Sequence, residues 1–405
     1  METVPERENA ARSCISVSGP DRWLKRTVKA GGAQRETGLA AGGAGWQDRR
    51  NAGMPYWRPR QKHEGMQMDD FHPTVAAPAF TGGLLARQAE RRGQAGAILG
   101  DPRARVLPLW RGRVLMGQER AADAALSGGA GDAVGGQIML AGVAPGHEVL
   151  NTAREAPVFL GADCTGAPWF AQDISDWAPE GPLPDMAAFF DPTAVQHPAL
   201  PPQWAFGELR GAMLALSPLE AEIAATARAI LHWHESHRFC ARCGQPSAPV
   251  EGGWQRRCPA CNTGHFPRTD PVVIMLVTQG NAALLGRSPA WPEGMYSCLA
   301  GFMEPGETME AAVAREVREE TGVPVGAVRY VTSQPWPFPA SLMLGCRAEA
   351  LDRALTLDPV EIEDALWVSR EALAEVFAGT HPRIRPPRKG AIAEYLMRQW
   401  LADRL

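Results

Sequence analysis

One stretch of the chain, residues 301–323, places glycines, charges and aliphatic residues at fixed intervals. Five residues, including a Pro-Gly pair that favours a turn, separate Gly301 from Glu307. The residues that follow predict a helix from Thr308 to Glu320. Gly322 ends this helix, because glycine readily adopts the left-handed conformation of a C-terminal cap. The stretch therefore predicts a tight loop followed by a single short helix.

Three carboxylates of this helix, Glu316, Glu319 and Glu320, share one face because their spacing is i, i+3 and i+4. Such neighbours repel one another, which raises their pKa values unless cations lie among them. Mg²⁺ or Mn²⁺, more than one ion, is the natural counter-charge for oxygen ligands. Glu307 and Arg315 are expected to form an ion pair that holds the loop against the helix.

Divalent ions held between carboxylates and a pyrophosphate orient and activate a water molecule. The acidic helix therefore predicts hydrolysis of a phosphoanhydride that joins a nucleoside to a second moiety. The alternative is a solvated acidic helix face, which is the usual meaning of a run of glutamates. The fixed spacing of glycine, arginine and glutamate favours the metal site.

Four of the eight cysteines lie within 22 residues and form two C-x2-C pairs separated by 14 residues. They are Cys240, Cys243, Cys258 and Cys261. Two such pairs supply the tetrahedral set of four thiolates that zinc prefers, so one structural Zn²⁺ per chain is predicted. Free cysteines are one alternative. A nucleic-acid-binding ribbon is another, favoured by Arg238, Arg242, Arg256 and Arg257.

Composition changes along the chain suggest five segments. Residues 1–68 are poor in large aliphatic side chains and are expected to be disordered or a mis-annotated extension, with Met66 or Met68 as a possible start. Residues 70–216 are predicted to form a first domain of short strands, and 217–236 a connecting helix that Ser217 caps. A zinc ribbon is predicted over 237–267, followed by a catalytic domain over 268–405 that mixes strands and helices.

The overall charge and the apolar runs exclude several classes of protein. The formal net charge is −4, which gives no strong basic field for nucleic acid or a membrane. The apolar run Val272–Val277 is far too short to cross a bilayer. The first residues carry acidic side chains and lack the apolar segment of a secretory signal. A cytoplasmic location without membrane contact is the default expectation.

A proline-rich segment, Ser333–Ser341, follows the acidic stretch and contains Trp336 and Phe338. Its three prolines are expected to hold the segment extended and rigid. Both aromatic rings are then presented with little conformational entropy left to lose. This arrangement predicts stacking on a nucleobase or a nicotinamide ring.

With this segment, SQPWPFPAS, and the stretch from Gly301 to Val323, the chain resembles the NADH pyrophosphatase subfamily of Nudix hydrolases. The resemblance covers roughly residues 75–405. It implies an α+β fold: a Nudix α/β/α sandwich preceded by a zinc ribbon and an N-terminal Nudix-like α/β domain, in a homodimer. The implied reaction is hydrolysis of NADH or NAD⁺ to nicotinamide mononucleotide and AMP, and the implied partners include NAD-capped RNA, whose cap some members remove.

The resemblance also assigns roles to individual positions. The implied metal ligands are Glu316, Glu320, Glu361 and the backbone carbonyl of Ala300, and Glu319 is a supporting base or ligand. The implied substrate contacts are Arg210, Phe266, Phe302, Gln334, Pro335, Trp336, Pro337, Phe338, Pro339, Ala340, Ser341 and Ala393. Phe266 stands where the family often has tyrosine, so a hydrogen bond through that hydroxyl is lost.

Two other functions stay open from the residues. One is a Nudix hydrolase of other dinucleotides, such as ADP-ribose, diadenosine polyphosphates or FAD. The other is an RNA-binding module that keeps the fold without the chemistry. The intact glutamates argue against the second, because a carboxylate cluster is costly to keep without cations.

Overall fold

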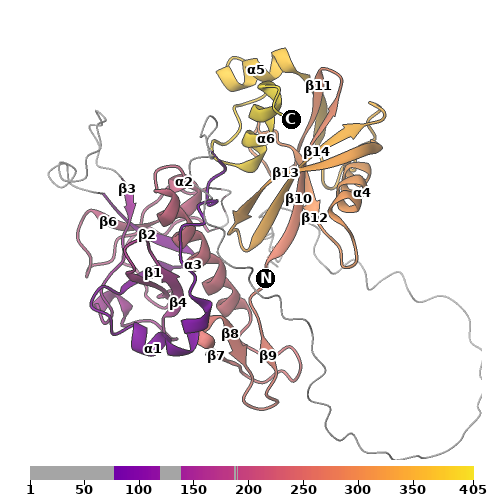
Figure 1. The fold of residues 1–405 in the computed structure, drawn as a ribbon. Coiled ribbons are helices and arrows are strands. Elements are labelled where there is room, and N and C mark those ends of the chain that lie inside the picture. Colours follow the sequence, from indigo (N-terminus) through magenta and orange to yellow (C-terminus); the bar gives the residue numbers. More distant parts are fainter. Residues whose placement is uncertain (1–76, 119–137, 187, 189) are drawn as a thin grey trace, which may run out of the picture. The chain divides into compact units, whose positions relative to one another are not determined.

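Three β-sheets follow one another along the chain, and each belongs to one of the predicted segments (Figure 1). The computed structural model describes residues 77–118, 138–186, 188 and 190–405, which lie in one compact unit. The prediction of disorder for residues 1–68 falls outside the described residues.

The N-terminal sheet is built from the short apolar runs predicted to be strands. Its strands are β1 (Arg105–Trp110), β2 (Arg113–Gln118), β3 (Ile138–Leu140), β4 (Val158–Ala162), β5 (Pro168–Asp173) and β6 (Trp204–Gly207). The order is β3-β2-β1-β5-β4, with β6 paired to β2 and with β1 parallel to β5. Short helices flank the sheet: η3 (Ala89–Gln94), α1 (Ala95–Ile98), η5 (Glu148–Leu150) and α2 (Leu209–Ala212).

The connecting helix α3 (Pro218–Ser236) has the predicted start and end. Ser217 accepts a hydrogen bond from the backbone N–H of Glu220, and the Glu220 carboxylate accepts one from the backbone N–H of Ser217. This reciprocal pair satisfies two backbone donors that a helix N-terminus otherwise leaves free. Apolar residues of α3, including Ile223 and Ile230, join the core of the N-terminal sheet. The helix thereby ties the first domain to the zinc ribbon.

The C-terminal sheet lies between two helical layers. Its strands are β10 (Asp270–Gln279), β11 (Ala282–Arg287), β12 (Leu299–Phe302), β13 (Val325–Trp336), β14 (Ser341–Ala350) and β15 (Asp364–Ser369). The order is β13-β14-β10-β11-β15, with β12 paired to β10 and with β10 parallel to β14. The helices are α4 (Met309–Thr321), α5 (Arg370–Ala378) and α6 (Ile392–Leu401).

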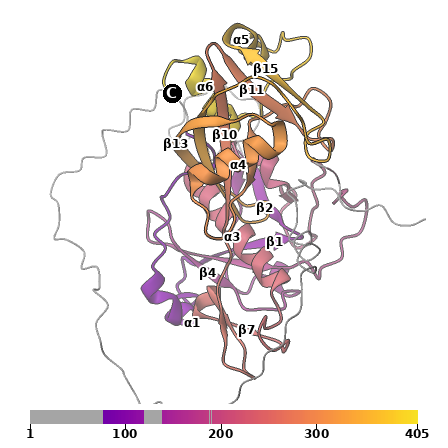
Figure 2. The same ribbon diagram turned by 90° about the vertical axis from the view of Figure 1, so that its right-hand side faces the viewer.

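Alternate side chains of β10 enter two separate cores. Val273 and Met275 pack in the cluster that contains Val313 and Val317 of α4. The intervening residues, such as Ile274, pack in the cluster formed with α5 and α6. Because successive side chains of a strand point to opposite faces, α4 covers one face of the sheet and α5 and α6 the other (Figure 2). The predicted α/β/α sandwich is confirmed.

The two large sheets share most of their topology. In each, a parallel central pair (β1 with β5, β10 with β14) is flanked by two hairpin partners (β2 and β4, β11 and β13). In the C-terminal sheet α4 lies between β12 and β13, whereas the described residues between β3 and β4 form only the short turn η5. The N-terminal domain is therefore a second copy of the sheet without the acidic helix in the part described.

In the described part of the chain, no helix is both long enough and apolar enough to cross a lipid bilayer.

Candidate active site

The acidic helix α4 begins and ends as its sequence predicts, to within one residue. The Thr308 side chain accepts a hydrogen bond from the backbone N–H of Ala311 and caps the N-terminus. Gly322 adopts φ 75° at the C-terminus, in the left-handed region. Before the helix, β12 runs beside β10 in the sheet, so the loop between Phe302 and Thr308 joins a fixed strand to a fixed helix.

Arg315 braces this loop. Its Nε and Nη2 atoms donate to the two carboxylate oxygens of Glu307 at 2.8 and 2.9 Å, and Nη2 also donates to the carbonyl of Phe302 at 2.8 Å. The predicted ion pair is thus confirmed as a two-point contact. The second terminal nitrogen donates to Glu316 at 2.9 Å and to Glu319 at 3.1 Å. One guanidinium therefore fixes the loop and orients two carboxylates of the helix.

Glu316 lies directly against β12. A Cβ atom at Gly301 would be only 1.9 Å from the carboxyl carbon of Glu316, so a larger residue there would displace this carboxylate. The Glu316 side chain is buried, and this burial raises its pKa despite the neighbouring Arg315. Ala300, the predicted carbonyl ligand, is the residue before Gly301 on the same strand.

Glu320 is the least compensated charge of the site. It is 5% exposed, and its Oε2 atom is buried without a hydrogen-bond partner. Burial first, and then the charges of Glu316 and Glu361, raise the pKa of Glu320 well above its usual range. Residues 356–358 are hydrogen-bonded to the C-terminal end of α4, since the backbone N–H of Asp358 donates to the carbonyl of Glu320 at 3.1 Å. This contact brings Glu361, three residues later, close to Glu320.

This donor set fits a hard divalent cation. A positive ion would compensate an orphaned buried carboxylate oxygen that lies beside two further carboxylates. The four cysteines are the only group of three or more residues among those described that could hold one metal ion as they stand, and their ligand atoms all lie within 4.8 Å of one another. The three glutamates are not gathered in this way.

The four cysteines form two matching knuckles. The sulfur atoms are 3.6 Å apart for Cys240 and Cys261 and 3.5 Å apart for Cys243 and Cys258. A tetrahedral zinc with bonds of roughly 2.3 Å requires sulfur separations of roughly 3.8 Å, so the site fits Zn²⁺. All four positions are thiolates, so the zinc is structural. A hairpin joins the two cysteine pairs. It consists of β7 (Ala248–Val250) and β8 (Gln255–Arg257), with η6 (Glu251–Gly253) as its turn, and β9 (Gly264–His265) adds a third strand.

Arg256, one of the four arginines that favour a nucleic-acid ribbon, is an internal residue. It is 2% exposed and donates to Glu155 at 3.0 Å and to the imidazole Nδ1 of His234 at 2.9 Å. The other ring nitrogen of His234 bonds the carbonyl of Gly253 at 2.8 Å. These bonds hold the ribbon, α3 and the N-terminal domain together, so Arg256 is not part of a solvated basic face.

The proline-rich segment differs from its expected presentation. Phe338 is 7% exposed and belongs to the core cluster of the N-terminal domain. Its ring lies beneath the guanidinium groups of Arg210 and Arg228, at 4.4 and 4.5 Å. Phe338 therefore packs against the N-terminal domain, and its predicted contact with a ligand stays a prediction. Trp336 is only partly buried, so part of its ring stays accessible.

Most other predicted substrate residues also divide by burial. Gln334, Pro337, Ala340 and Ala393 are buried, whereas Phe302, Pro335, Trp336, Pro339 and Ser341 are partly or fully exposed. Arg210, above Phe338, is brought beside this segment. Phe266 lies on the ribbon and is 70% exposed. Their predicted roles in substrate binding stay predictions.

Three residues near the site were not among those predicted. Arg228 on α3 contacts Phe338, and Phe80 packs against both Trp336 and Phe338 with ring centroids 6.5 Å apart. Asp358 adds negative charge near Glu320. Arg228 and Phe80 lie far from the segment in sequence and carry no motif, so a single sequence offers no signal for them. Asp358 is three residues before Glu361 and was within reach of the same reasoning.

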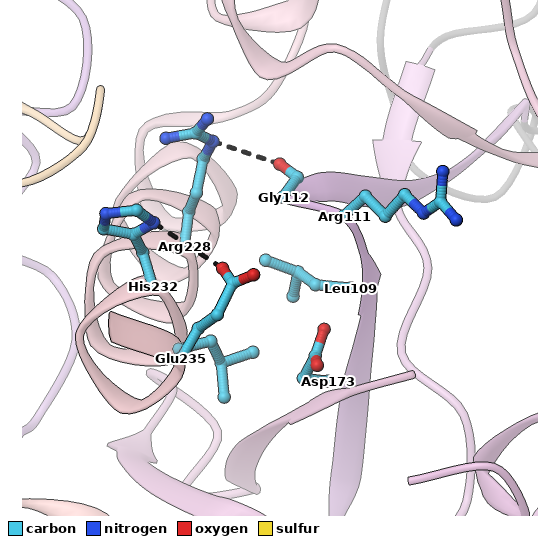
Figure 3. A pocket seen from close by; sticks show the side chains of 8 residues that line it. Leu109, Arg111, Gly112, Asp173, Arg228, His232 and Glu235 are labelled. Atoms are coloured by element: carbon cyan, nitrogen blue, oxygen red, sulfur yellow. Dashed lines mark hydrogen bonds and ion pairs between the residues drawn. The ribbon is translucent and has the colours of Figure 1, made fainter. Parts of the chain in front are cut away.

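The described cavities lie away from the acidic helix. One of about 90 Å³ and one of about 260 Å³ line the side of α3, where they share Asp173, Leu231 and Glu235 (Figure 3). The buried carboxylate oxygens of α4, rather than a large cavity, mark the candidate metal site.

Family models match three consecutive parts of the chain. Residues 103–233 match the NADH pyrophosphatase-like rudimentary NUDIX domain, residues 235–266 the NADH pyrophosphatase zinc ribbon domain, and residues 267–391 the NUDIX domain. The word rudimentary agrees with the N-terminal sheet that repeats the C-terminal topology without its acidic helix in the described residues.

Several named proteins are similar in sequence to this chain. The human protein "NAD(P)H pyrophosphatase NUDT13, mitochondrial" is 34% identical over 287 residues, which are 64% of this chain and 78% of the relative. The human "NAD-capped RNA hydrolase NUDT12" is 42% identical over 244 residues, 58% of this chain and 50% of the relative. "NAD-capped RNA hydrolase NudC" of Stutzerimonas stutzeri is 46% identical over 173 residues, 43% and 59% of the two chains.

The acidic helix and the sandwich around it define a Nudix domain. The chain belongs to the Nudix hydrolases of the NADH pyrophosphatase type, which carry a zinc ribbon before the Nudix domain. It spans about half the length of the NUDT12 proteins that it matches.

Proposed function

We propose that the protein hydrolyses the pyrophosphate bond of NADH or NAD⁺ and releases AMP and nicotinamide mononucleotide. The observation that carries this proposal is the buried, unpaired Oε2 atom of Glu320, next to Glu316 and Glu361. When bound there, Mg²⁺ or Mn²⁺ neutralises phosphate charge and makes water a better nucleophile. Mg²⁺ and Mn²⁺ are chosen because hard cations prefer oxygen ligands.

The side chains around the site are assigned four roles: metal binding, proton transfer, positioning of the loop and substrate binding. Glu316, Glu320, Glu361 and the carbonyl of Ala300 hold the cations, and Glu319, with a side chain that is 61% exposed, accepts the proton of the attacking water. Arg315 and Glu307 keep the loop and helix in register. The accessible part of Trp336 stacks on a ring of the substrate, and Arg210 pairs with a phosphate.

NAD-capped RNA is a second proposed substrate, because two of the relatives are named for that activity. NADH and NAD-capped RNA share the pyrophosphate, the nicotinamide ring and the adenine ring. The same carboxylates can therefore act on either substrate. We also propose a cytoplasmic homodimer. Phe266, an aromatic residue that is 70% exposed, is suited to contact with a second copy.

A side-by-side assay separates the candidate functions. The full chain is incubated with NADH, ADP-ribose or NAD-capped RNA, each with Mg²⁺ and with Mn²⁺, and AMP or decapped RNA is measured. We expect NADH to be cleaved with the highest kcat/KM of the small molecules. A much higher kcat/KM for ADP-ribose overturns the proposed substrate in favour of another dinucleotide. RNA binding that ignores the cap, without any cleavage, overturns the proposed chemistry.

A further inference from the structure

Trp336 lies between two anchors, and the N-terminal part of the chain contributes Ala79 to the first and Arg228 to the second. The first anchor precedes it: the Gln334 side chain donates to the carbonyls of Ala79 and Gly390, both at 2.9 Å, and accepts from the backbone N–H of Ile392 at 2.8 Å. Gln334 is 0% exposed, so these bonds are shielded from water. The strand is therefore fixed two residues before the tryptophan.

The second anchor follows Trp336 and centres on Arg228. One terminal nitrogen of Arg228 donates to the carbonyl of Pro337, and Nε donates to the carbonyl of Gly112 at 3.0 Å. Figure 3 shows the guanidinium directed at Gly112 across the side of α3. The same group lies over the ring of Phe338 at 4.5 Å. One arginine thus joins the N-terminal sheet to the residues directly after the tryptophan.

The N-terminal end of this link is stiff. Arg111 and Gly112 form the two-residue turn between β1 and β2, with φ values of 48° and 73°. Positive φ at both central residues is typical of the type I′ turn, whose twist matches that of the strands. Arg228 keeps its charge at neutral pH, although burial lowers its pKa to about 10. A charged donor between two carbonyls and an aromatic ring is favourable in such a setting.

We propose that Arg228 is a positioning residue for substrate binding: it clamps the carbonyl of Pro337 to the N-terminal domain and so fixes the pose of Trp336. The rudimentary domain then takes part in substrate recognition through a residue that touches no substrate. This inference rests on the proposed stacking role of Trp336. Phe80, buried against both aromatic rings, supports the same pose from a third segment.

The test is a double-mutant cycle on the full chain with NADH and Mg²⁺. Arg228→Met keeps the length of the side chain and removes its donors. We expect KM to rise about tenfold with kcat nearly unchanged, because stacking acts equally on the bound substrate and the transition state. If Arg228 acts through Trp336, the double variant with Trp336→Ala is no worse than Trp336→Ala alone. The proposal is overturned if the fold-losses in kcat/KM of the two single variants multiply in the double variant. It is also overturned if KM is unchanged in Arg228→Met.

Arg113→Met is a matched control. Arg113 is also a buried arginine of the N-terminal domain, and it donates to two backbone carbonyls, those of Thr193 at 2.7 Å and Asp191 at 3.3 Å. Its partners belong to its own domain. This variant is expected to lower stability while leaving KM for NADH within about twofold, since it does not touch the proline-rich segment.

Hydrogen exchange separates this inference from the proposed function and needs no substrate. Arg228→Lys is a milder second variant, because it keeps the charge but lacks the planar guanidinium that reaches both carbonyls. We expect the peptide covering 333–341 to exchange faster in Arg228→Lys than in the wild type, with α4 unchanged. Unchanged exchange of that peptide overturns the clamp. If the wild-type protein leaves NADH uncut while the peptide still exchanges faster in Arg228→Lys, only the proposed function is contradicted.

Discussion

Among the glutamates of α4, Glu320 has a buried carboxylate oxygen that accepts no hydrogen bond. Its Oε2 atom is buried and unpaired, whereas Glu316 and Glu319 both accept hydrogen bonds from Arg315. A buried carboxylate in this state is costly unless a cation binds it. The glutamates therefore differ in role although they share one face of the same helix.

Replacing either buried glutamate by glutamine tests these roles. Glu316→Gln and Glu320→Gln should each lower kcat for NADH by ~10²-fold or more, because each removes charge that holds the cations. Glu310→Gln is the control, since Glu310 is exposed in the first turn of the same helix and should leave kcat nearly unchanged. Near-normal kcat in both buried variants contradicts the assignment.

Trp336 allows a second test at the level of a single side chain. Trp336→Ala should weaken NADH cleavage by about 1–3 kcal/mol in kcat/KM, the range expected for loss of one stacked ring. Tyr330 lies on the same strand and is 54% exposed, so Tyr330→Ala is a matched aromatic control. Equal losses in the two variants argue against stacking at Trp336.

The zinc ribbon acts as an element that links α3 to the C-terminal domain. Its two knuckles repeat the same bonds: the backbone N–H of Gly244 donates to the carbonyl of Cys240, and that of Asn262 to the carbonyl of Cys258, both at 2.8 Å. Gly244 and Asn262 both have positive φ, 74° and 58°. The geometry is set by local turns and is completed by the metal.

Cys243→Ser should therefore affect stability more than chemistry. Losing one thiolate should cost about 2 kcal/mol or more, because binding of structural zinc is part of the folding free energy. The measurements are zinc content per chain and the unfolding temperature, together with kcat for NADH at a temperature where the variant is folded. Full zinc content with a normal unfolding temperature contradicts a structural role.

The link between α3 and the ribbon predicts a dependence of stability on pH. Burial, chiefly, lowers the pKa of His234 below its usual value of 6.5. The folded state thus binds a proton more weakly than the unfolded chain. The contribution of neutral His234 to the free energy of unfolding is therefore complete above about pH 6.5, and it is lost as the pH falls below that value. The free energy of unfolding should fall between pH 7 and 5, and fall less steeply in His234→Gln. Identical slopes contradict this role.

Across the whole molecule, the sequence predicts best what local spacing determines. The cysteine pairs and the acidic stretch form their geometry within 22 and 23 residues, so their positions alone indicate the chemistry. The strands β12 and β15 and the helix α5 have no predicted counterpart, although Ser369 caps α5 with a bond from Ala372 N–H. That start signal was present in the sequence.

Contacts between domains were beyond reach of the sequence. Arg228 and Pro337 are 109 residues apart, and Gln334 and Ala79 are 255 apart. Phe338 carries the same aromatic signal as Trp336, but Phe338 is buried in the core cluster of the N-terminal domain, whereas Trp336 packs against that cluster and stays partly exposed. Only the folded chain shows which ring does which, because packing partners that distant leave no periodic pattern.

The central claim is that the carboxylates of α4, with divalent cations, direct water at the bond between two phosphates. The most direct measurement is chromatography of the products that the full chain forms from NADH, in a titration of Mg²⁺ from zero with EDTA at the start. We expect equal amounts of AMP and the reduced mononucleotide to form, at a rate that rises from near zero and saturates with Mg²⁺. Intact NADH at every Mg²⁺ and Mn²⁺ concentration, or AMP release that ignores the cation, contradicts the claim.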